Sequence, residues 1–309
     1  MEAPNFNPPS SWRRKAEASG DRPVIKFPSS VNFCQLINNP GKDIKVIRRI
    51  GSESTEGEVY QIQYKGTDAA LKVMPITTDK DNEKNQNEME IANLASDMVL
   101  ENTWPHFPIV YGFGRCYDSN FYNPSWKGKS TNYACMLKLR ETLPSKTKQM
   151  DALYRTGQSP ETIARRFNLD LQLCEDLETP SDFLISELAR EDLSSWASLI
   201  HSSKEWKSNV SDILETILFM REEMQISHND LHWGNVLIKF VDNSDIPLVH
   251  DFGKSGKITN DNLLDDINKF ISSWTGASYQ IPSDIREFFI QAEKDIKENK
   301  DIPEILDNL

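Results

Sequence analysis

Polar side chains are concentrated in the segment HNDLHWGNVLI, which begins at His228 and ends at Ile238. Asp230 and Asn235 lie within it, and a later segment, PLVHDFG, carries Asp251. The apolar runs in both segments are typical of short strands, and a hairpin between them would bring Asn235 close to Asp251. An amide oxygen and a carboxylate are hard ligands that suit Mg²⁺ bridging phosphates, and Asp230 would be left to accept a hydroxyl proton.

A metal site of another kind is the alternative for the same segment. His228 and His232, with Asp230, have a spacing at which zinc ligands occur. The sequence around them has no third His and no Cys cluster to complete a zinc site. We therefore favour phosphate chemistry, and we expect His228 to pack in the core.

The first half of the chain contains a loop that could fold over phosphates. Gly51 and Gly57 flank the Ser/Thr/Glu-rich stretch between two predicted strands, and Val59 follows at the start of the second strand. Glycine lets a backbone approach a ligand closely, so this loop is a candidate phosphate-binding segment.

A lysine inside an apolar strand adds a cation to this half. Lys72 lies in AALKVM, where burying a lone ammonium group would be costly. The helix predicted at 84–100 offers a partner, since Glu88 shares its face with apolar residues whereas Glu90 shares its face with polar ones. We expect Glu88 to face inward.

The elements that must position these residues divide into a strand-rich first half and a helix-rich second half. Strands are predicted at 58–64, 69–74, 107–115, 132–138 and 182–189. The stretch NVSDILETILFMREEMQ predicts an amphipathic helix immediately before His228, and two further helices are predicted at about 261–275 and 282–299. This order indicates an α+β fold of two unlike lobes with a cleft.

Taken in order, the motifs resemble the signature of eukaryotic-type protein kinases from about residue 44 to 275. HNDLHWGNVLI resembles most the haspin-like kinases and the Ser/Thr kinases of large DNA viruses, and it is also similar to the HxDxHxxN pattern of aminoglycoside and choline kinases. The matching elements are Gly51/Gly57–Val59, Ala70-Leu71-Lys72, Glu88, His228 to Asn235, and Asp251-Phe252-Gly253.

The resemblance implies a bilobal protein-kinase-like fold with a very short activation segment. Residues 44–185 would be a β-rich N-lobe with a helical insertion at about 141–180, preceded by residues 1–43, whose Pro-, Asn- and Ser-rich composition predicts an extended arm. Residues 186–309 would then form a reduced helical C-lobe.

The same resemblance implies ATP and Mg²⁺ as the cofactors. Lys72 would hold the α- and β-phosphates and pair with Glu88. Asp230 would be the catalytic base, and Asn235 and Asp251 would hold Mg²⁺.

The resemblance also implies nucleotide contacts outside the phosphate site. Gly57 would let the loop backbone approach the phosphates. Glu187 to Ala189 would form the hinge that meets adenine, with Ser186 as the gatekeeper.

Several departures from the family pattern change what we expect. The loop GSESTEG keeps two of the usual glycines and spaces them more widely. Asn229 replaces the Arg that meets a phosphorylated activation loop, so we expect no such switch. His232 stands where Ser/Thr kinases have Lys. Asp265 or Asp266 would brace the loop backbone, and the sequence does not distinguish between these two.

The function predicted from these residues is a Ser/Thr protein kinase that transfers the γ-phosphate of ATP to a protein hydroxyl. One alternative is a small-molecule kinase of the aminoglycoside or choline type, which His232 and the short segment after Asp251 favour. Another is a pseudokinase scaffold that binds partners through residues 1–43 and 141–180.

Composition limits the remaining possibilities. The net charge is −12, which disfavours nucleic acid as a main partner. The stretch 159–177 has a helix-turn-helix-like apolar pattern, but its acidic surroundings favour a packing or partner role over DNA binding.

The lack of an evident targeting signal and the scattered cysteines predict an intracellular chain that is not secreted. No stretch approaches the roughly 20 apolar residues of a membrane span, and no signal peptide is evident at the start of the sequence. The four cysteines are scattered, so we expect reduced thiols. Host cytoplasm, nucleus and virion would all fit a viral kinase.

Overall fold

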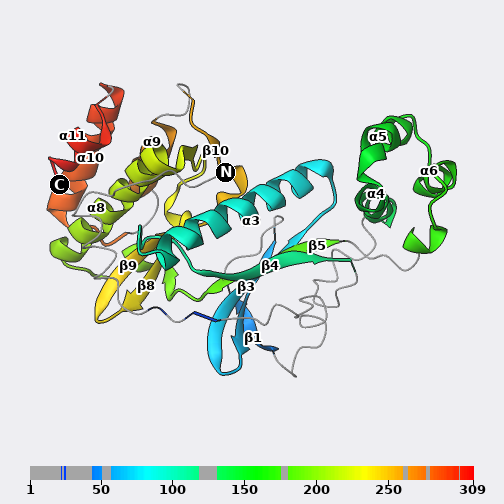
Figure 1. The fold of residues 1–309 in the computed structure, drawn as a ribbon. Helices are drawn as coiled ribbons and strands as arrows, with labels where there is room; N and C mark the ends of the chain where they lie inside the picture. Colours follow the sequence, from blue (N-terminus) through cyan, green and yellow to red (C-terminus); the bar gives the residue numbers. More distant parts are fainter. Residues whose placement is uncertain are drawn as a thin grey trace. The chain divides into compact units, whose positions relative to one another are not determined.

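The computed structural model describes residues 22, 24–25, 44–50, 57–117, 131–174, 180–259, 264–275, 279–298 and 300–309. The chain is α+β, as predicted, and its largest sheet has the strand order β1-β2-β3-β5-β4 (Figure 1). These strands are β1 (Ile44–Ile50), β2 (Glu58–Tyr64), β3 (Thr67–Pro75), β4 (Val110–Cys116) and β5 (Ser181–Glu187).

The chain divides into two compact units, each of which is described by itself. The first comprises residues 1–24, 86–110 and 186–309, and the second comprises 25–85 and 111–185. Helix α3 (Asp79–Leu100) contributes to both, and one division between the units falls directly before Ser186.

The hairpin β2–β3 carries the predicted lysine strand. Its turn uses Lys65 and Gly66, both with positive φ (47° and 89°), which is the two-residue turn that matches the twist of antiparallel strands. In the resulting register Val59 lies opposite Lys72. The strands predicted at 58–64 and 69–74 are therefore confirmed.

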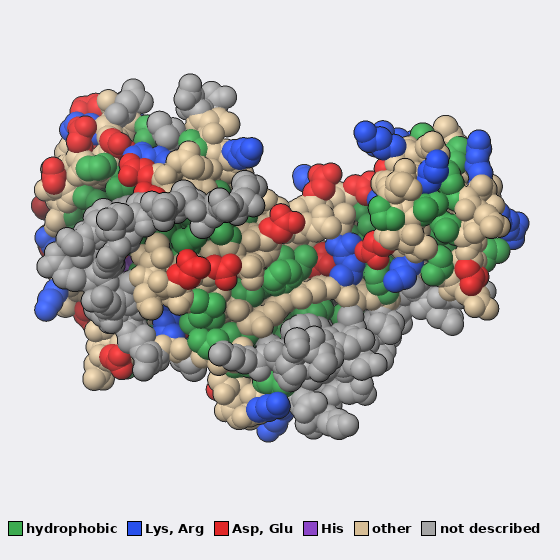
Figure 2. All heavy atoms as spheres, in the orientation of Figure 1, with side chains coloured by type: hydrophobic (Ala, Val, Ile, Leu, Met, Phe, Trp, Pro, Cys, Tyr) green, Lys and Arg blue, Asp and Glu red, His purple; other side chains and the backbone are tan. Residues whose placement is uncertain are grey.

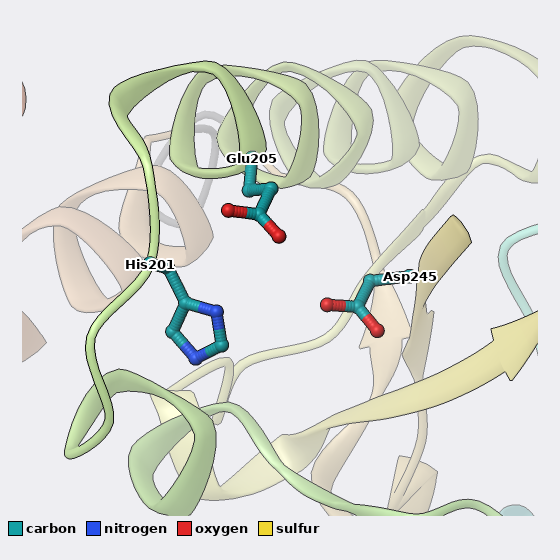
Figure 3. Close-up of side chains that lie close together, drawn as sticks. All are labelled: His201, Glu205 and Asp245. Carbon is teal, nitrogen blue, oxygen red and sulfur yellow. The ribbon is translucent and has the colours of Figure 1, made fainter. Parts of the chain in front are cut away.

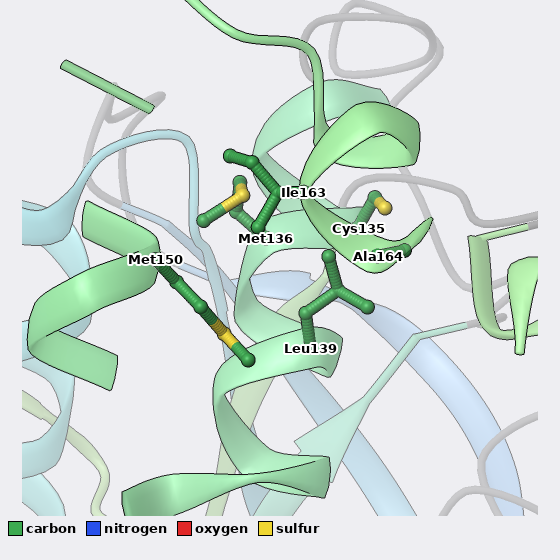
Figure 4. Close-up of a cluster of buried hydrophobic side chains, with 6 residues drawn as sticks. All are labelled: Cys135, Met136, Leu139, Met150, Ile163 and Ala164. Atoms are coloured by element: carbon green, nitrogen blue, oxygen red, sulfur yellow. The ribbon is translucent and has the colours of Figure 1, made fainter. Parts of the chain in front are cut away.

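Residues 131–174 form a helical module with a core of its own. It consists of α4 (Thr131–Thr142), the short η2 (Pro144–Lys146), α5 (Thr147–Arg155), α6 (Pro160–Arg166) and η3 (Leu171–Cys174). Figure 4 shows the six side chains that meet at its centre, namely Cys135, Met136, Leu139, Met150, Ile163 and Ala164. Ser159 caps α6 by accepting a hydrogen bond from the Thr162 backbone N–H, with Pro160 at the first helical position.

The strand predicted at 132–138 is wrong, because α4 occupies this segment. Cys135, Met136 and Leu139 all reach the module core. A set that combines spacings of three and four residues lies on one face of a helix but not on one face of a strand. A short apolar run does not distinguish a strand from a helix by itself, and here packing against α5 and α6 decides. The helical insertion therefore begins well before 141.

The prediction of reduced thiols is also wrong. Cys135 and Cys174 form a disulfide with a Cα–Cα distance of 4.8 Å, and Cys116 is disulfide-bonded as well. No cysteine in the described ranges is free. Because disulfides persist in oxidising surroundings, the cysteines no longer support an intracellular location.

The surface of the helical module is rich in cations although the whole chain is acidic. Figure 2 shows Lys and Arg side chains over this module. Those that are exposed include Lys146, Lys148, Arg155, Arg165 and Arg166. The helical module 131–174 thus carries a net positive charge, whereas the net charge of the whole chain is −12.

The first unit is largely helical around two small sheets. Its helices are α7 (Leu193–Ala197), α8 (Ser203–Phe219), α9 (Asp265–Ser272), α10 (Ser283–Lys297) and α11 (Ile302–Leu306), and the last turn of α8 continues as the π-helix η4 (Met220–Met224). Its strands are β6 (Glu191–Asp192), β7 (Ile226–Ser227), β8 (Val236–Val241), β9 (Ser244–Val249) and β10 (Gly256–Lys257). The short 3₁₀ turns are η5 (Trp233–Asn235), η6 (Phe252–Lys254) and η7 (Ser273–Thr275).

Aromatic side chains fill the centre of this unit. Trp206 lies edge-on to Trp196 at 4.9 Å between ring centroids, and it also contacts Trp233 and Phe289. All four side chains are fully buried. Within the described ranges, no helix is long and apolar enough to cross a membrane.

Candidate active site

The loop between β7 and β8 is held by one buried carboxylate. Asp266, near the start of α9, accepts hydrogen bonds from the Ser227 hydroxyl (2.8 Å) and from the backbone N–H groups of His228 (2.6 Å) and Asn229 (2.7 Å). Its side chain is 6 % exposed. Because one buried carboxylate accepts hydrogen bonds from all three donors, it fixes the position of the backbone directly before Asp230.

This geometry decides between the two aspartates that the sequence left open. Asp265 is exposed, whereas its neighbour Asp266 points into the unit. On α9 the buried face also carries Ile267, Phe270 and Ile271, so Asp266 enters with the apolar side of the helix.

The predicted hairpin places Asn235 beside the segment of Asp251. Strands β8 and β9 are antiparallel with Val236 opposite Val249, and the His250 N–H donates to the Asn235 carbonyl (3.1 Å). The Asn235 side-chain amide donates to the Asp230 carbonyl (2.9 Å), which leaves its own oxygen as a potential ligand. Asp251 has φ of 67°, in the left-handed region that Asp tolerates. The hairpin therefore places the backbone of Asn235 next to the segment that leads to Asp251, as predicted.

Asp230 carries a lysine on each of its carboxylate oxygens. Lys254 Nζ lies 2.7 Å from Oδ2, and Lys269 Nζ contacts Oδ1. Partial burial would raise the pKa of Asp230, but the hydrogen bonds and charges of these two lysines outweigh it and lower the pKa. Asp230 is therefore ionised at neutral pH, as an acceptor for a proton must be.

Neither histidine of the motif is placed to bind zinc with Asp230. His228 is fully buried, its Nε2 contacts the His250 carbonyl (2.8 Å), and burial lowers its pKa so that the ring stays neutral. His232 turns back on its own loop, where its Nδ1 accepts from the Gly234 N–H (3.1 Å). Among the described residues, a group of His and carboxylate side chains whose spacing would suit a metal ion lies elsewhere, at His201, Glu205 and Asp245.

The segment after Asp251 is tied down by amide side chains. Asn229, with φ of 60°, donates to the Lys254 carbonyl (3.0 Å), and Asn87 donates to the carbonyls of Phe252 (3.0 Å) and Ser255 (2.8 Å). Beyond it, β10 pairs with β7. These bonds fix the short segment that follows Asp251.

The structure describes most of the residues predicted to contact the nucleotide phosphates. Lys72 and Val59 are half-buried opposite each other, and Glu88 is 2 % exposed while Glu90 is exposed. The inward face predicted for Glu88 is thus confirmed. A Cβ at Gly57 would lie 2.7 Å from the Val73 carbonyl, so close strand packing alone requires glycine there. Gly51 lies outside the described residues.

The predicted hinge begins at a buried ion-pair hub. Glu187 pairs with Arg22 and with Lys239 (3.2 Å) and accepts from the Ile109 N–H (2.8 Å). Its own N–H donates to the Ile109 carbonyl (2.9 Å), so this N–H is not available to a nucleotide. Ala189 follows as a half-buried residue.

Sequence reasoning missed several side chains that hold this region. We predicted Arg22 only as part of the extended arm 1–43, yet its guanidinium donates to the Phe107 carbonyl (2.6 Å) as well as pairing with Glu187. Lys254 directly follows Asp251-Phe252-Gly253, and Lys269 lies one helical turn after Asp266, so their positions next to known motifs could have signalled them.

Comparison with known proteins adds no assignment: no family model and no curated protein matches the chain.

Proposed function

We propose that this chain is an ATP- and Mg²⁺-dependent phosphotransferase with a protein-kinase-like, bilobal fold, and that its acceptor is a Ser or Thr hydroxyl of a protein. The observation that supports it most is the loop 227–235. Asp230 is ionised at neutral pH, the backbone before it is fixed by Asp266, and Asn235 is held next to the strand that leads to Asp251.

The proposed step is a transfer in line between two oxygens. Asp230 orients the acceptor hydroxyl and accepts its proton, and the acceptor oxygen forms a bond to the γ-phosphorus. The bond from the γ-phosphorus to the bridging oxygen of ADP breaks, and ADP leaves with that electron pair.

Asn235 and Asp251 fit the ligand set of Mg²⁺. Both offer hard oxygen atoms, and the Asn235 amide is oriented by its bond to the Asp230 carbonyl. When bound, the ion neutralises charge on the transferred phosphate. The residues on the sheet that we assign to the nucleotide are Gly51, Gly57, Val59 and Lys72, with Glu88 as the partner of Lys72 and with Glu187 and Ala189 at the hinge.

Lys254 and Lys269 take the place of the lysine that Ser/Thr kinases carry at the position of His232. The ring of His232 is engaged with the Gly234 backbone, while both lysines hold their ammonium groups at Asp230. We assign to them the stabilisation of negative charge on the transferred phosphate.

The acceptor distinguishes the proposal from a small-molecule kinase. The segment between Asp251 and α9 is short, and Asn87 and Asn229 hold its first residues by hydrogen bonds. A short segment of this kind is compatible with a small-molecule acceptor as well as with a protein. The experiment therefore offers both acceptor classes to the full chain. It measures transfer of labelled γ-phosphate from Mg-ATP to a panel of generic proteins and, separately, to aminoglycosides and amino alcohols.

We expect label on protein serine or threonine and no stimulation of ATP consumption by small hydroxyl compounds. Label on the small compounds alone would overturn the protein acceptor while keeping the phosphotransferase. Tight Mg-ATP binding without any transfer would favour the pseudokinase scaffold. No ATP binding would overturn the proposal as a whole.

A further inference from the structure

Three metal-binding side chains converge on a site outside the residues assigned to phosphate transfer. His201 lies in the loop between α7 and α8, Glu205 in the first turn of α8, and Asp245 near the start of β9. Each offers one ligand atom, and these atoms lie within 4.8 Å of one another. Figure 3 shows the imidazole and the two carboxylates turned toward a common centre.

A fourth residue, Trp196, orients two of the three donors from outside the group. Its carbonyl lies 2.9 Å from His201 Nε2, and its indole N–H donates to Asp245 Oδ2 (2.8 Å). The indole ring stacks on the imidazole at 3.7 Å between centroids. Trp196 is fully buried, so packing in the core fixes the positions of its carbonyl and its indole N–H.

The bond to Trp196 determines which imidazole nitrogen is left for a ligand. A carbonyl accepts only from a protonated nitrogen, so Nε2 carries the hydrogen and Nδ1 keeps a lone pair in the neutral ring. In Figure 3 the nitrogen next to the attachment of the ring faces the carboxylates. A histidine whose second nitrogen donates to a carbonyl is the usual arrangement around protein-bound metals.

Glu205 is held by the capping box of α8. The backbone N–H and the hydroxyl of Ser202 both donate to Oε2, at 2.8 Å and 2.7 Å. These bonds lower the pKa of Glu205 and keep the carboxylate charged. They use one oxygen, so Oε1 remains on an exposed side chain that can adjust its position.

Asp245 completes the charge of the group. Its Oδ1 is buried and accepts no hydrogen bond, although Arg190 Nη2 lies 3.2 Å away as an ion-pair partner. Arg190 is shared with Glu191 (2.8 Å), and its side chain is 42 % exposed. Arg190 is thus one exposed cation beside the two carboxylates of Glu205 and Asp245. The group keeps a net negative charge, which a divalent cation would balance.

We propose that His201, Glu205 and Asp245 bind a divalent transition metal of the zinc type, with water at a fourth position. An imidazole with two carboxylates favours such an ion over Mg²⁺ or Ca²⁺, which prefer oxygen ligands alone. Ligand bonds of about 2 Å require the donors to draw together, which the exposed Glu205 permits. The ion joins the start of α8 to the hairpin β8–β9.

The test measures Zn²⁺ binding by chelator-treated full-length protein, by titration calorimetry and by competition with a zinc indicator dye. Glu205→Gln is the informative variant, because Gln at this position preserves the capping box and removes the charged ligand. Glu215→Gln on the same helix is the matched control. Asp251→Asn tests whether Zn²⁺ binds instead at the site assigned to Mg²⁺, because Zn²⁺ affinity would then fall in this variant.

We expect one tight Zn²⁺ equivalent in the wild type, a loss of affinity of at least about tenfold in Glu205→Gln and in His201→Ala, and no change in Glu215→Gln or Asp251→Asn. The proposal is overturned if the wild type binds no Zn²⁺. It is also overturned if both ligand variants bind like the wild type, or if Asp251→Asn abolishes binding.

Discussion

The loop 227–235 and the helical module 131–174 are held by opposite kinds of interaction. In the loop, a single buried carboxylate accepts hydrogen bonds from Ser227, His228 and Asn229. In the module, an apolar core around Met150 and Ile163 is closed by the disulfide Cys135–Cys174.

The difference concerns what each arrangement specifies. Hydrogen bonds to one carboxylate define the position of a few backbone atoms, as a reacting group such as Asp230 requires. Apolar packing and a disulfide stabilise the helical module as a whole, but they do not define the position of any one polar atom. We therefore expect substitutions that disturb the loop to change phosphate transfer, and substitutions in the module to change local stability alone.

Among the substitutions that compare the two regions, Asp266→Ala is expected to have the largest effect. It leaves two backbone N–H groups and a hydroxyl without their acceptor, at a cost of about 3 kcal/mol or more in the free energy of unfolding. Phosphate transfer should fall by roughly a hundredfold, since 1 Å of misplacement costs about that much. Urea unfolding and the transfer assay measure both quantities.

Asp265→Ala is the control for this substitution, because the neighbouring Asp265 is exposed. It should change the free energy of unfolding by less than about 0.5 kcal/mol. Equal losses in the two variants would remove the special role of Asp266.

The double variant Cys135→Ala, Cys174→Ala should loosen the module and leave the loop intact. Loss of a disulfide of this separation costs about 2–4 kcal/mol. Hydrogen exchange should accelerate within 131–174 and stay unchanged in 227–235. Loss of phosphate transfer in this variant would show that the two regions are not independent.

Ile163→Val should have a smaller effect of the same kind. Ile163 is fully buried in the module core, and removing one methylene group there costs about 1 kcal/mol. Ile200→Val is the matched control, because Ile200 is 88 % exposed. Thermal unfolding of both variants should show a shift in the first and none in the second.

The smallest expected effect is a displacement of a pH profile. Lys269 helps to lower the pKa of Asp230, so Lys269→Ala should raise that pKa. The rate of phosphate transfer depends on ionised Asp230. The acidic limb of the pH–rate profile should therefore lie at a higher pH in Lys269→Ala than in the wild type. Lys294→Ala, on the exposed face of α10, should leave the acidic limb where it is.

Local pattern was sufficient for the elements that carry the candidate site. The alternation in β2 and β3 and the positions of Asn235 and Asp251 around a hairpin followed from residue types alone. The inward face of Glu88 followed from its apolar neighbours on the helix. In each case the information lies within a few residues of the position predicted.

The sequence failed where distant contacts decide. The segment 132–138 is apolar enough for a strand, and it became α4 because α5 and α6 supply a core for it. Cys135 and Cys174 gave no signal of pairing, since their proximity arises only after the module folds. The choice between Asp265 and Asp266 needed the packing of α9, and the two lysines on Asp230 come from different elements.

The central claim is that Asp230 accepts the proton of the acceptor hydroxyl. The direct measurement compares the wild type with Asp230→Asn, in both the rate of γ-phosphate transfer and the affinity for Mg-ATP. We predict a loss of rate of roughly a thousandfold, with the affinity little changed, because a positioned base contributes about that much. Transfer that survives at the wild-type rate in Asp230→Asn would contradict the account.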